Sequence, residues 1–298
     1  MRVALDLLGG DHAPSAVLDG ALLAACEDVE IVLVGPAAQA QQLLAERDAA
    51  GRFRLVEASQ VIGMGEDPAR AARVKKDSSV HVAHRLVRDG DCDAAVSVGS
   101  SGAARACAVL VLGRLTPRPA LAVVVPARNG PLVLLDVGAT VDSTPEQLAQ
   151  HAVLGAAYAQ VVLGLSDPRV GLLNVGQEAG KGDQLRRDSF AALQALPLRF
   201  VGNVEGQDAA LGGKADVIVT DGFTGNVLLK GMEGATARVD GGPLPASAIL
   251  LGVRGVSVVG HGSASAQDVA ECIRAAADAA RQGLVRQLRS ALQAGVPA

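Results

Sequence analysis

Aromatic residues are scarce in this chain, making up 2% of its 298 residues, with no Trp and one Tyr. Proteins that stack nucleic-acid bases, or sugars, on their surface rely on aromatic side chains, so no such binding platform is expected. The net charge also argues against a nucleic-acid-binding protein, because 27 Lys and Arg against 31 Asp and Glu give −4. Nucleic-acid-binding domains carry a basic footprint instead, so no nucleic-acid partner is expected.

Cysteines are few and lack the paired spacing of a zinc site or a disulfide framework; they are Cys26, Cys92, Cys107 and Cys272. This pattern fits a reducing cytosol. No apolar run reaches the ~18 residues of a membrane-spanning helix. The residues Arg2–Asp6 are predicted to form a strand rather than part of a signal peptide. We therefore expect a cytoplasmic protein, with peripheral contact at a membrane surface left open.

Short runs of Val, Leu and Ile alternate with longer Ala-rich amphipathic stretches. The expected strands are Val3–Leu5, Ile31–Val34, Arg54–Val56, Ala94–Val98, Leu121–Val125, Val133–Asp136, Val170–Asn174, Phe200–Val204, Val217–Thr220 and Val256–Val259. The expected helices are Ser15–Cys26, Ala38–Ala50, Ser79–Asp89, Gly102–Leu112, Pro145–Leu163, Asp183–Leu196 and Gln267–Leu292. Several strands are apolar throughout, as strands covered on both faces are. The alternation predicts an α/β fold with a mostly parallel sheet and helices on both faces.

Seven of the segments that follow these strands are rich in glycine and small polar residues. They are Gly9–Asp11, Ser97–Gly102, Asp136–Thr140, Asn174–Glu178, Gly202–Gly206, Asp221–Asn226 and Gly260–Ser263. Ligands of such sheets bind beyond the carboxyl ends of the strands. Glycine permits close backbone approach, and a following helix offers unpaired N–H groups to an anion. The loops together predict a ligand that carries phosphate or another anionic group.

Two segments come close to nucleotide-binding motifs without matching them. Ser97-x-Gly99-x-x-Gly102 lacks the first glycine of a dinucleotide fingerprint. Gly176-x-x-x-Gly180-Lys181-Gly182 is one residue short of a P-loop and has Gly where Ser or Thr would bind magnesium. Hydrolysis of a nucleoside triphosphate is therefore excluded. His81 and His84 stand three apart without a carboxylate motif, so no metal site is expected.

Only five of the basic residues are lysines, and three of them lie in or beside the glycine-rich segments: Lys181, Lys214 and Lys230. A compact ammonium group is a good point charge for phosphate. Lys181 has the most glycine-rich surroundings and is the preferred candidate. For Lys214 and Lys230 a solvated loop lysine is an equally good interpretation.

The blocks of sequence, taken in order, resemble the phosphate acyltransferase PlsX family of bacterial phospholipid synthesis. They are Leu5–Asp11, Pro68–Ser79, Gly90–Ala103, Leu135–Asp142, Leu172–Gly182, Phe200–Gly206, Ala215–Lys230 and Gly260–Ser263. The resemblance covers nearly the whole chain. It implies one phosphate acyltransferase domain over residues 1–298, with a Rossmann-like fold related to phosphotransacetylases and isopropylmalate-type dehydrogenases. It also implies a homodimer without a cofactor, and transfer of an acyl group from acyl carrier protein to inorganic phosphate.

The chain departs from the family pattern in three places. Ser100-Ser101 replace the usual Asn-Thr, and Thr140 replaces an Asn, so hydroxyls stand where amides are usual. Asp240-Gly241-Gly242 follows almost directly on Arg238-Val239, where the family has a longer helical excursion. That excursion is shortened or missing near 239–240. Since the family associates it with the dimer and the membrane surface, both of these expectations weaken.

The resemblance and the loop chemistry together assign the site. Lys181 and Asn226 are the catalytic candidates, stabilising phosphate or the tetrahedral oxyanion. The expected phosphate- or substrate-binding residues are Asp6, Gly10, Asp11, Gly99, Ser100, Ser101, Gly102, Asp136, Asn174, Glu178, Asn203, Glu205, Asp221, Thr224, Gly225 and His261. The alternative for the Asp and Asn residues is that they cap loops or satisfy backbone groups. His261 is equally well explained as a packed, hydrogen-bonded histidine.

Acyl carrier proteins are acidic, so docking on this acidic chain needs a local basic patch. The densest one is Arg70, Arg73, Lys75 and Lys76. Its alternative interpretation is a solvated helix face.

Two other functions compete with the acyltransferase. One is an NAD-dependent dehydrogenase on a related fold, disfavoured by the missing first glycine and by the lack of a cluster of metal-binding carboxylates. The other is a non-catalytic scaffold that binds acyl carrier protein or membrane, which would not need the polar loops.

Overall fold

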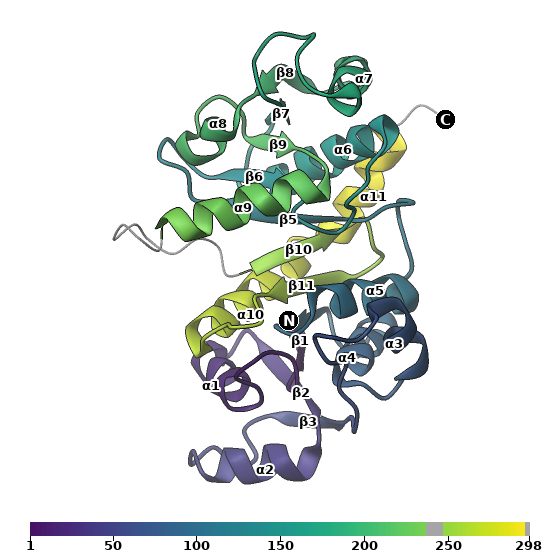
Figure 1. Ribbon diagram of the computed structural model, residues 1–298. Helices are drawn as coiled ribbons and strands as arrows, with labels where there is room; N and C mark the ends of the chain where they lie inside the picture. The colour runs from purple at the N-terminus through teal and green to yellow at the C-terminus, as the bar shows by residue number, and fades with distance from the viewer. Residues whose placement is uncertain (237–246, 296–298) are drawn as a thin grey trace. The chain divides into compact units, whose positions relative to one another are not determined.

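The computed structural model describes residues 1–236 and 247–295 and divides the chain into two compact units (Figure 1). The first unit is Met1–Arg114 with Ala246–Val285, and the second is Leu115–Pro245 with Arg286–Ala298. Each contains its own strands and helices. The expectation of one functional domain over 1–298 stays a prediction, and the Val239-Asp240 join lies outside the described residues.

The strands of the first unit lie in the order β3-β2-β1-β4-β11-β10. Their bounds are β1 (Arg2–Asp6), β2 (Glu30–Gly35), β3 (Arg54–Glu57), β4 (Ala94–Ser97), β10 (Ser247–Leu251) and β11 (Val256–Gly260). All the pairs are parallel except β10 with β11. In the central register Val3 lies opposite Ile31 on one side and Ala94 on the other. The carboxyl ends of β1, β4 and β11 therefore share one edge, where the glycine-rich loops begin.

Two pairs of helices cover the two faces of this sheet, α1 with α10 and α4 with α5 (Figure 1). The helices of the first unit are α1 (Ser15–Ala24), α2 (Ala37–Ala45), α3 (Pro68–Val74), α4 (Ser79–Arg88), α5 (Ser101–Leu112) and α10 (Ala266–Arg281). Gly20 lets α1 approach α10, because a Cβ there would lie 2.5 Å from Cβ of Val269. The last helix, α11 (Leu284–Gly295), begins just after Gly283, which has a φ of 66°.

The strands of the second unit lie in the order β5-β6-β9-β7-β8. They are β5 (Ala120–Val125), β6 (Leu132–Leu135), β7 (Arg169–Leu173), β8 (Arg199–Val204) and β9 (Val217–Val219), and only β5 with β6 is antiparallel. The helices are α6 (Pro145–Val162), α7 (Gln184–Gln194), α8 (Gly206–Leu211) and α9 (Gly222–Thr236). Gly155 brings α6 onto the sheet, since a Cβ there would lie 2.7 Å from the side chain of Val217.

The predicted mostly parallel α/β architecture is confirmed, and every predicted strand is present within two residues at each end. The prediction missed β10 and the helices α3, α8 and α9. It was wrong about Asp221–Asn226, which is not a loop, because α9 already begins at Gly222. It was also wrong in extending one helix over Gln267–Leu292, since that stretch breaks between Arg281 and Leu284. Among the described residues, no helix is both long and apolar enough to cross a bilayer.

Candidate functional site

The predicted site residues gather in both units, and each group is described within its own unit. The first unit holds Asp6, Gly10, Asp11, Gly99, Ser100, Ser101, Gly102 and His261. The second unit holds Asp136, Asn174, Glu178, Lys181, Asn203, Glu205, Asp221, Thr224, Gly225 and Asn226.

In the first unit, the loops after β1, β4 and β11 contact one another. The backbone N–H of Asp11 donates to the carbonyl of Gly262 at 2.7 Å. Gly10 has a φ of +109°, and a Cβ there would lie 3.1 Å from the carbonyl oxygen of Val98. Glycine is therefore required at this crossing of loops. A small cavity of about 180 Å³ opens here, and its lining includes Asp6, Gly10, Gly99 and Ser100.

Ser100 caps α5, because its Oγ accepts the N–H of Ala103 at 3.3 Å. Ser101 and Gly102 form the first turn, which contains no acidic residue. The positive end of the α5 dipole is therefore not neutralised within the helix, a feature that favours a bound anion. The two serines supply hydroxyls and backbone N–H groups at this end of the helix.

Asp6 and His261 both have local partners. The carboxylate of Asp6 is buried and accepts the hydroxyl of Ser97 at 2.7 Å and the N–H of Leu8 at 3.2 Å. Burial raises the pKa of Asp6, although these hydrogen bonds oppose the shift. His261 is exposed, with Nδ1 2.7 Å from Oγ of Ser263. The contacts of Asp6 favour the loop-fixing interpretation.

In the second unit, Asp136 organises the loop after β6. Its fully buried carboxylate accepts backbone N–H groups from Leu121, Gly138, Ala139 and Thr140, at 3.0, 3.0, 2.8 and 2.7 Å. Burial raises the pKa of Asp136. Oδ1 accepts three of these bonds and Oδ2 accepts the one from Thr140. Asp136 therefore shapes the loop, as the alternative interpretation of the sequence held.

The first turn of α9 packs on this same loop. Asn226 is exposed, and its Nδ2 donates to the carbonyl of Val137 at 3.0 Å. Gly225 lies against Asp136 so closely that any Cβ would collide with the carbonyl oxygen of that residue. Asp221 begins the helix by accepting the N–H of Thr224 on Oδ1 at 2.9 Å. The α9 turn and the Asp136 loop thus form one rigid assembly that presents Asn226.

The loop after β7 presents Lys181. Nδ2 of Asn174 donates to the carbonyl of Lys181 at 3.1 Å, and the Lys181 N–H donates to the carbonyl of Glu178 at 3.1 Å. Asn203 holds the same turn, donating from Nδ2 to the carbonyl of Glu178 at 2.8 Å. Glu205 accepts Gln177 Nε2 at 3.0 Å. Asn174, Asn203 and Glu205 therefore shape the loop, consistent with the alternative that the Asn residues satisfy backbone groups.

The ammonium group of Lys181 is exposed and has no hydrogen bond or ion pair with the residues that the structure describes. The other two lysines near glycine-rich segments differ. Lys214 donates to Asp208 at 3.2 Å, and Lys230 donates to Glu233 at 2.6 Å. Of these three lysines, Lys181 is the one whose charge is left for a ligand.

Arg186 is the main residue that the sequence analysis missed. It lies in the first turn of α7 and is only 8% exposed. Its guanidinium donates to Asp183 Oδ2 at 3.0 Å, to the hydroxyls of Thr220 and Thr224 at 3.1 and 2.9 Å, and to Oδ2 of Asp221. A cation in the first turn of a helix opposes the helix dipole, which signals a partner elsewhere in the fold. This was the clue available in the sequence.

The pKa of Asp221 reflects these contacts. Burial acts to raise it, but the N–H and hydroxyl of Thr224 and the charge of Arg186 outweigh burial and lower the pKa. Asp221 therefore stays ionised as the partner of Arg186. This carboxylate is committed to the fold rather than free for a ligand.

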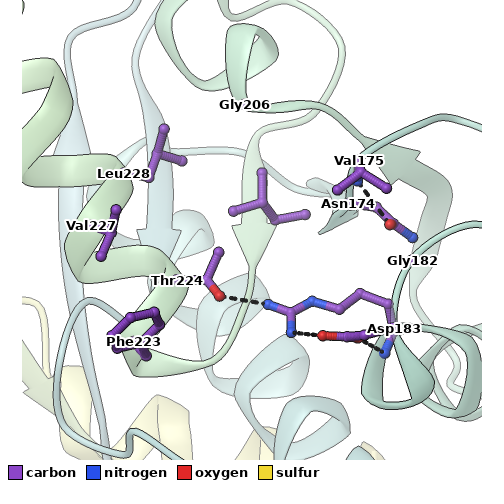
Figure 2. Close-up of a pocket in the computed structure, with 11 residues that line it drawn as sticks. Asn174, Val175, Gly182, Asp183, Gly206, Phe223, Thr224, Val227 and Leu228 are labelled. Atoms are coloured by element: carbon purple, nitrogen blue, oxygen red, sulfur yellow. Dashed lines mark hydrogen bonds and ion pairs between the residues drawn. The ribbon is translucent and has the colours of Figure 1, made fainter.

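A larger cavity of about 580 Å³ opens beside these residues in the second unit (Figure 2). Its lining is Leu173, Asn174, Val175, Gly182, Asp183, Arg186, Gly206, Phe223, Thr224, Val227 and Leu228. Two predicted positions, Asn174 and Thr224, form part of this lining. Four more are next to a lining residue in the sequence: Lys181, Glu205, Gly225 and Asn226.

Cysteine chemistry is disfavoured. Burial raises the pKa of Cys92 to about 11, and of Cys107 and Cys272 to about 12 each. A thiol is a nucleophile only as its thiolate, so these three are inert near neutral pH. Cys26 is exposed. Across residues 1–236 and 247–295, no group of three or more His, Cys, Asp and Glu residues is placed to hold a metal ion.

The predicted docking patch is only partly available. Arg70, Arg73 and Lys76 are exposed on and just after α3. Lys75 instead donates to the carbonyl of Val61 at 2.9 Å and to Glu66 at 2.6 Å. Its charge is therefore neutralised by the neighbouring loop.

The fold is similar to that of phosphotransacetylases. A phosphotransacetylase from Streptococcus pyogenes aligns with a TM-score of 0.71 over 94% of each chain, at 17% identity. A 4-hydroxythreonine-4-phosphate dehydrogenase from Klebsiella pneumoniae aligns with a TM-score of 0.62 over 94% of this chain and 97% of the other, at 16% identity. At these identities the likeness shows the fold alone.

Sequence comparison is decisive for the family. A family model described as fatty acid synthesis protein matches residues 1–241. A protein of Desulfitobacterium hafniense strain Y51, named phosphate acyltransferase, is 40% identical over 326 aligned positions, covering 98% of this chain and 97% of that protein. One of Heliobacterium modesticaldum, with the same name, is 42% identical over all of this chain and 98% of its own length. The chain belongs to this phosphate acyltransferase family, so the resemblance read from its loops is confirmed.

Proposed function

We propose that the protein transfers a fatty acyl group from acyl carrier protein to inorganic phosphate, giving an acyl phosphate for phospholipid synthesis. The observation that carries this proposal is the 40% identity, along 98% of the chain, to a protein named phosphate acyltransferase. Membership of the family and the exposed basic residues on and just after α3 support a carrier-bound donor.

The chemistry needs no covalent enzyme intermediate. A phosphate oxygen attacks the thioester carbonyl carbon, and the resulting tetrahedral oxyanion collapses with cleavage of the carbon–sulfur bond. The carrier thiol leaves as a thiolate, whose conjugate acid has a pKa of about 8.5, so little acid assistance is required. The protein must hold two reactants in line and stabilise the oxyanion.

The described residues suit those tasks. The proposal assigns the unpaired ammonium of Lys181 to the phosphate or the oxyanion, and the Asn226 amide to the same charge. In the first unit it assigns phosphate binding to Ser100, Ser101 and the first turn of α5, where no acidic side chain competes. Supporting roles fall to Asp136, Asn174, Asn203 and Asp221, because each makes a hydrogen bond that holds a loop or the α9 turn.

We also propose where the carrier protein docks, how the chain assembles and where the protein is located. Arg70, Arg73 and Lys76 form the docking patch for the acidic carrier, while Lys75 supports the loop that contains Glu66. We further propose a cytoplasmic homodimer that associates peripherally with the membrane. The fold shared with a dehydrogenase does not by itself favour the dehydrogenase alternative. The sequence also lacks the first glycine of the dinucleotide-binding fingerprint.

The test follows the carrier thiol. Purified full-length protein is mixed with acyl carrier protein bearing a palmitoyl thioester, and release of free thiol is recorded as phosphate is varied. Saturable, phosphate-dependent release supports the proposal. Thiol release that does not depend on the phosphate concentration indicates a thioesterase. Binding of the carrier without thiol release indicates a scaffold.

A further inference from the structure

The 580 Å³ cavity of the second unit has one polar end and one apolar side (Figure 2). Phe223, Val227 and Leu228 project from α9 on one side, while Val175 lies across from them in the loop that follows β7. Its volume falls within the range of about 300–1,000 Å³ that is typical of small-molecule sites. It therefore has the size of a binding site rather than of a packing defect.

The polar lining of this cavity is already satisfied. Asn174 accepts the N–H of Val175 at 2.8 Å and donates to the Lys181 carbonyl. Thr224 both donates to Asp221 and accepts from Arg186. The one cationic lining residue, Arg186, is shared between two carboxylates, that of Asp183 at 3.0 Å and that of Asp221. No lining side chain therefore offers an unpaired positive charge to an anion such as free phosphate.

The apolar side chains of the lining are left exposed to water. The side chains of Val175, Phe223 and Val227 are 80%, 61% and 57% exposed. Covering them with an apolar ligand would remove this surface from water. Hydrocarbon is the chemistry that this lining recognises.

The position of the cavity relative to the catalytic candidates identifies the hydrocarbon. Gly182 lines the cavity and directly follows Lys181, while Thr224 lies two residues before Asn226. A chain lying against Val227 and Leu228 would thus bind beside the loop that carries Lys181 and the helix that carries Asn226. We propose that the cavity binds the alkyl chain of the acyl donor, and so sets the dependence of the reaction on chain length. The inference rests on the proposed function and locates its acyl subsite.

The test compares Val227→Gln with Val162→Gln. Val162 ends α6 and is 41% exposed, but it does not line the cavity, so it is a matched control. The activity arm measures kcat/KM with carrier proteins bearing hexanoyl, decanoyl and palmitoyl chains. We expect Val227→Gln to lower the palmitoyl value about tenfold, the scale of losing one apolar pocket contact, and the hexanoyl value by less than about twofold. Val162→Gln should leave all three unchanged.

A binding arm needs no turnover. Cis-parinaric acid, a fluorescent fatty acid, is titrated into the wild type and both variants, and only Val227→Gln should weaken its binding. If no chain length supports phosphate-dependent release, the proposed function fails, while the binding arm still tests the cavity.

Three outcomes overturn the inference: equal losses at every chain length, unchanged values at every chain length, or unchanged parinarate binding in Val227→Gln. Sedimentation of the variants separates the causes of an equal loss. A Val227→Gln protein that sediments as a smaller species than the wild type would mean that a second copy of the chain covers this face instead.

Discussion

Arg186 and Asp221 form a buried ion pair that joins the first turn of α7 to the residue preceding α9; the two residues are 8% and 5% exposed. The loop that contains Lys181 leads directly into α7, and Asn226 lies on α9. The pair therefore fixes the loop that carries one catalytic candidate against the helix that carries the other. Neither residue needs to touch substrate for this role.

We predict that Arg186→Gln destabilises the protein by about 3–5 kcal/mol, because it leaves the Asp221 carboxylate buried without its partner. The free energy of unfolding in urea measures the effect. The double variant Arg186→Gln/Asp221→Asn should recover part of the loss, since it removes both charges. Losses that simply add in the double variant would show that the two residues are not coupled.

Lys181→Met should lower kcat at least ~10²-fold, the scale of losing one preorganised electrostatic donor. The exposed side chain has no partner among the described residues, so the midpoint of thermal unfolding should not change. Lys230→Met is the matched control, because Lys230 is also exposed but pairs with Glu233. Near-normal turnover of Lys181→Met, with an unchanged phosphate dependence, would remove Lys181 from the mechanism.

Charge reversal in the docking patch is expected to change the apparent KM specifically for carrier-bound substrate. Arg73→Glu/Lys76→Glu should raise the apparent KM for carrier-bound substrate about tenfold and flatten its salt dependence, because two attractive charges become repulsive. Activity on a short acyl thioester without the carrier should be spared. The double variant Arg52→Glu/Arg54→Glu makes the same charge change elsewhere in the first unit. A similar effect in that control would mean that net charge, rather than this patch, governs docking.

The buried side chain of His84 is expected to make the free energy of unfolding depend on pH. It is buried, with Nδ1 2.7 Å from the Val80 carbonyl oxygen and Nε2 2.9 Å from Oγ of Ser257. Burial lowers its pKa from 6.5 to about 4. Between these values the unfolded chain binds a proton that the folded protein does not, so stability is lost as pH falls below 6.5. This residue alone should cost about 2 kcal/mol at pH 5.

The measurement for His84 is urea unfolding of the wild type and His84→Gln at pH 7 and pH 5. The difference between the two proteins isolates His84 from Asp6 and Asp136, whose raised pKa values act in the opposite direction at lower pH. The variant should lose about 2 kcal/mol less than the wild type between these pH values. Parallel losses would show that His84 does not titrate with unfolding.

The sequence predicted the parts of this fold that depend on local pattern. Apolar strand runs and Ala-rich helices were found because their periodicity is local. The helix α9 was missed because glycines such as Gly222 and Gly225 are poor helix formers. They are there because of tertiary contacts; a Cβ on Gly222 would lie 2.7 Å from the carbonyl oxygen of Thr140.

The same limit applies to the site. Lys181 was identified from its glycine-rich surroundings, and the structure leaves its ammonium group unpaired among the described residues. Arg186 was missed because its partner Asp221 lies 35 residues away in the sequence. The polar residues at the strand ends could be recognised as a group. Which of them hold loops and which face a ligand depends on hydrogen bonds that only the folded chain forms.

Phosphorus NMR of the reaction mixture distinguishes acyl transfer to phosphate from hydrolysis, because it identifies the product rather than the rate at which it forms. Wild-type protein is incubated with palmitoyl acyl carrier protein and inorganic phosphate, without a nucleotide. We expect an acyl phosphate resonance to grow as the phosphate resonance falls, one for one with free carrier thiol. Release of thiol with no new phosphorus resonance, and with free fatty acid as the product, would contradict it.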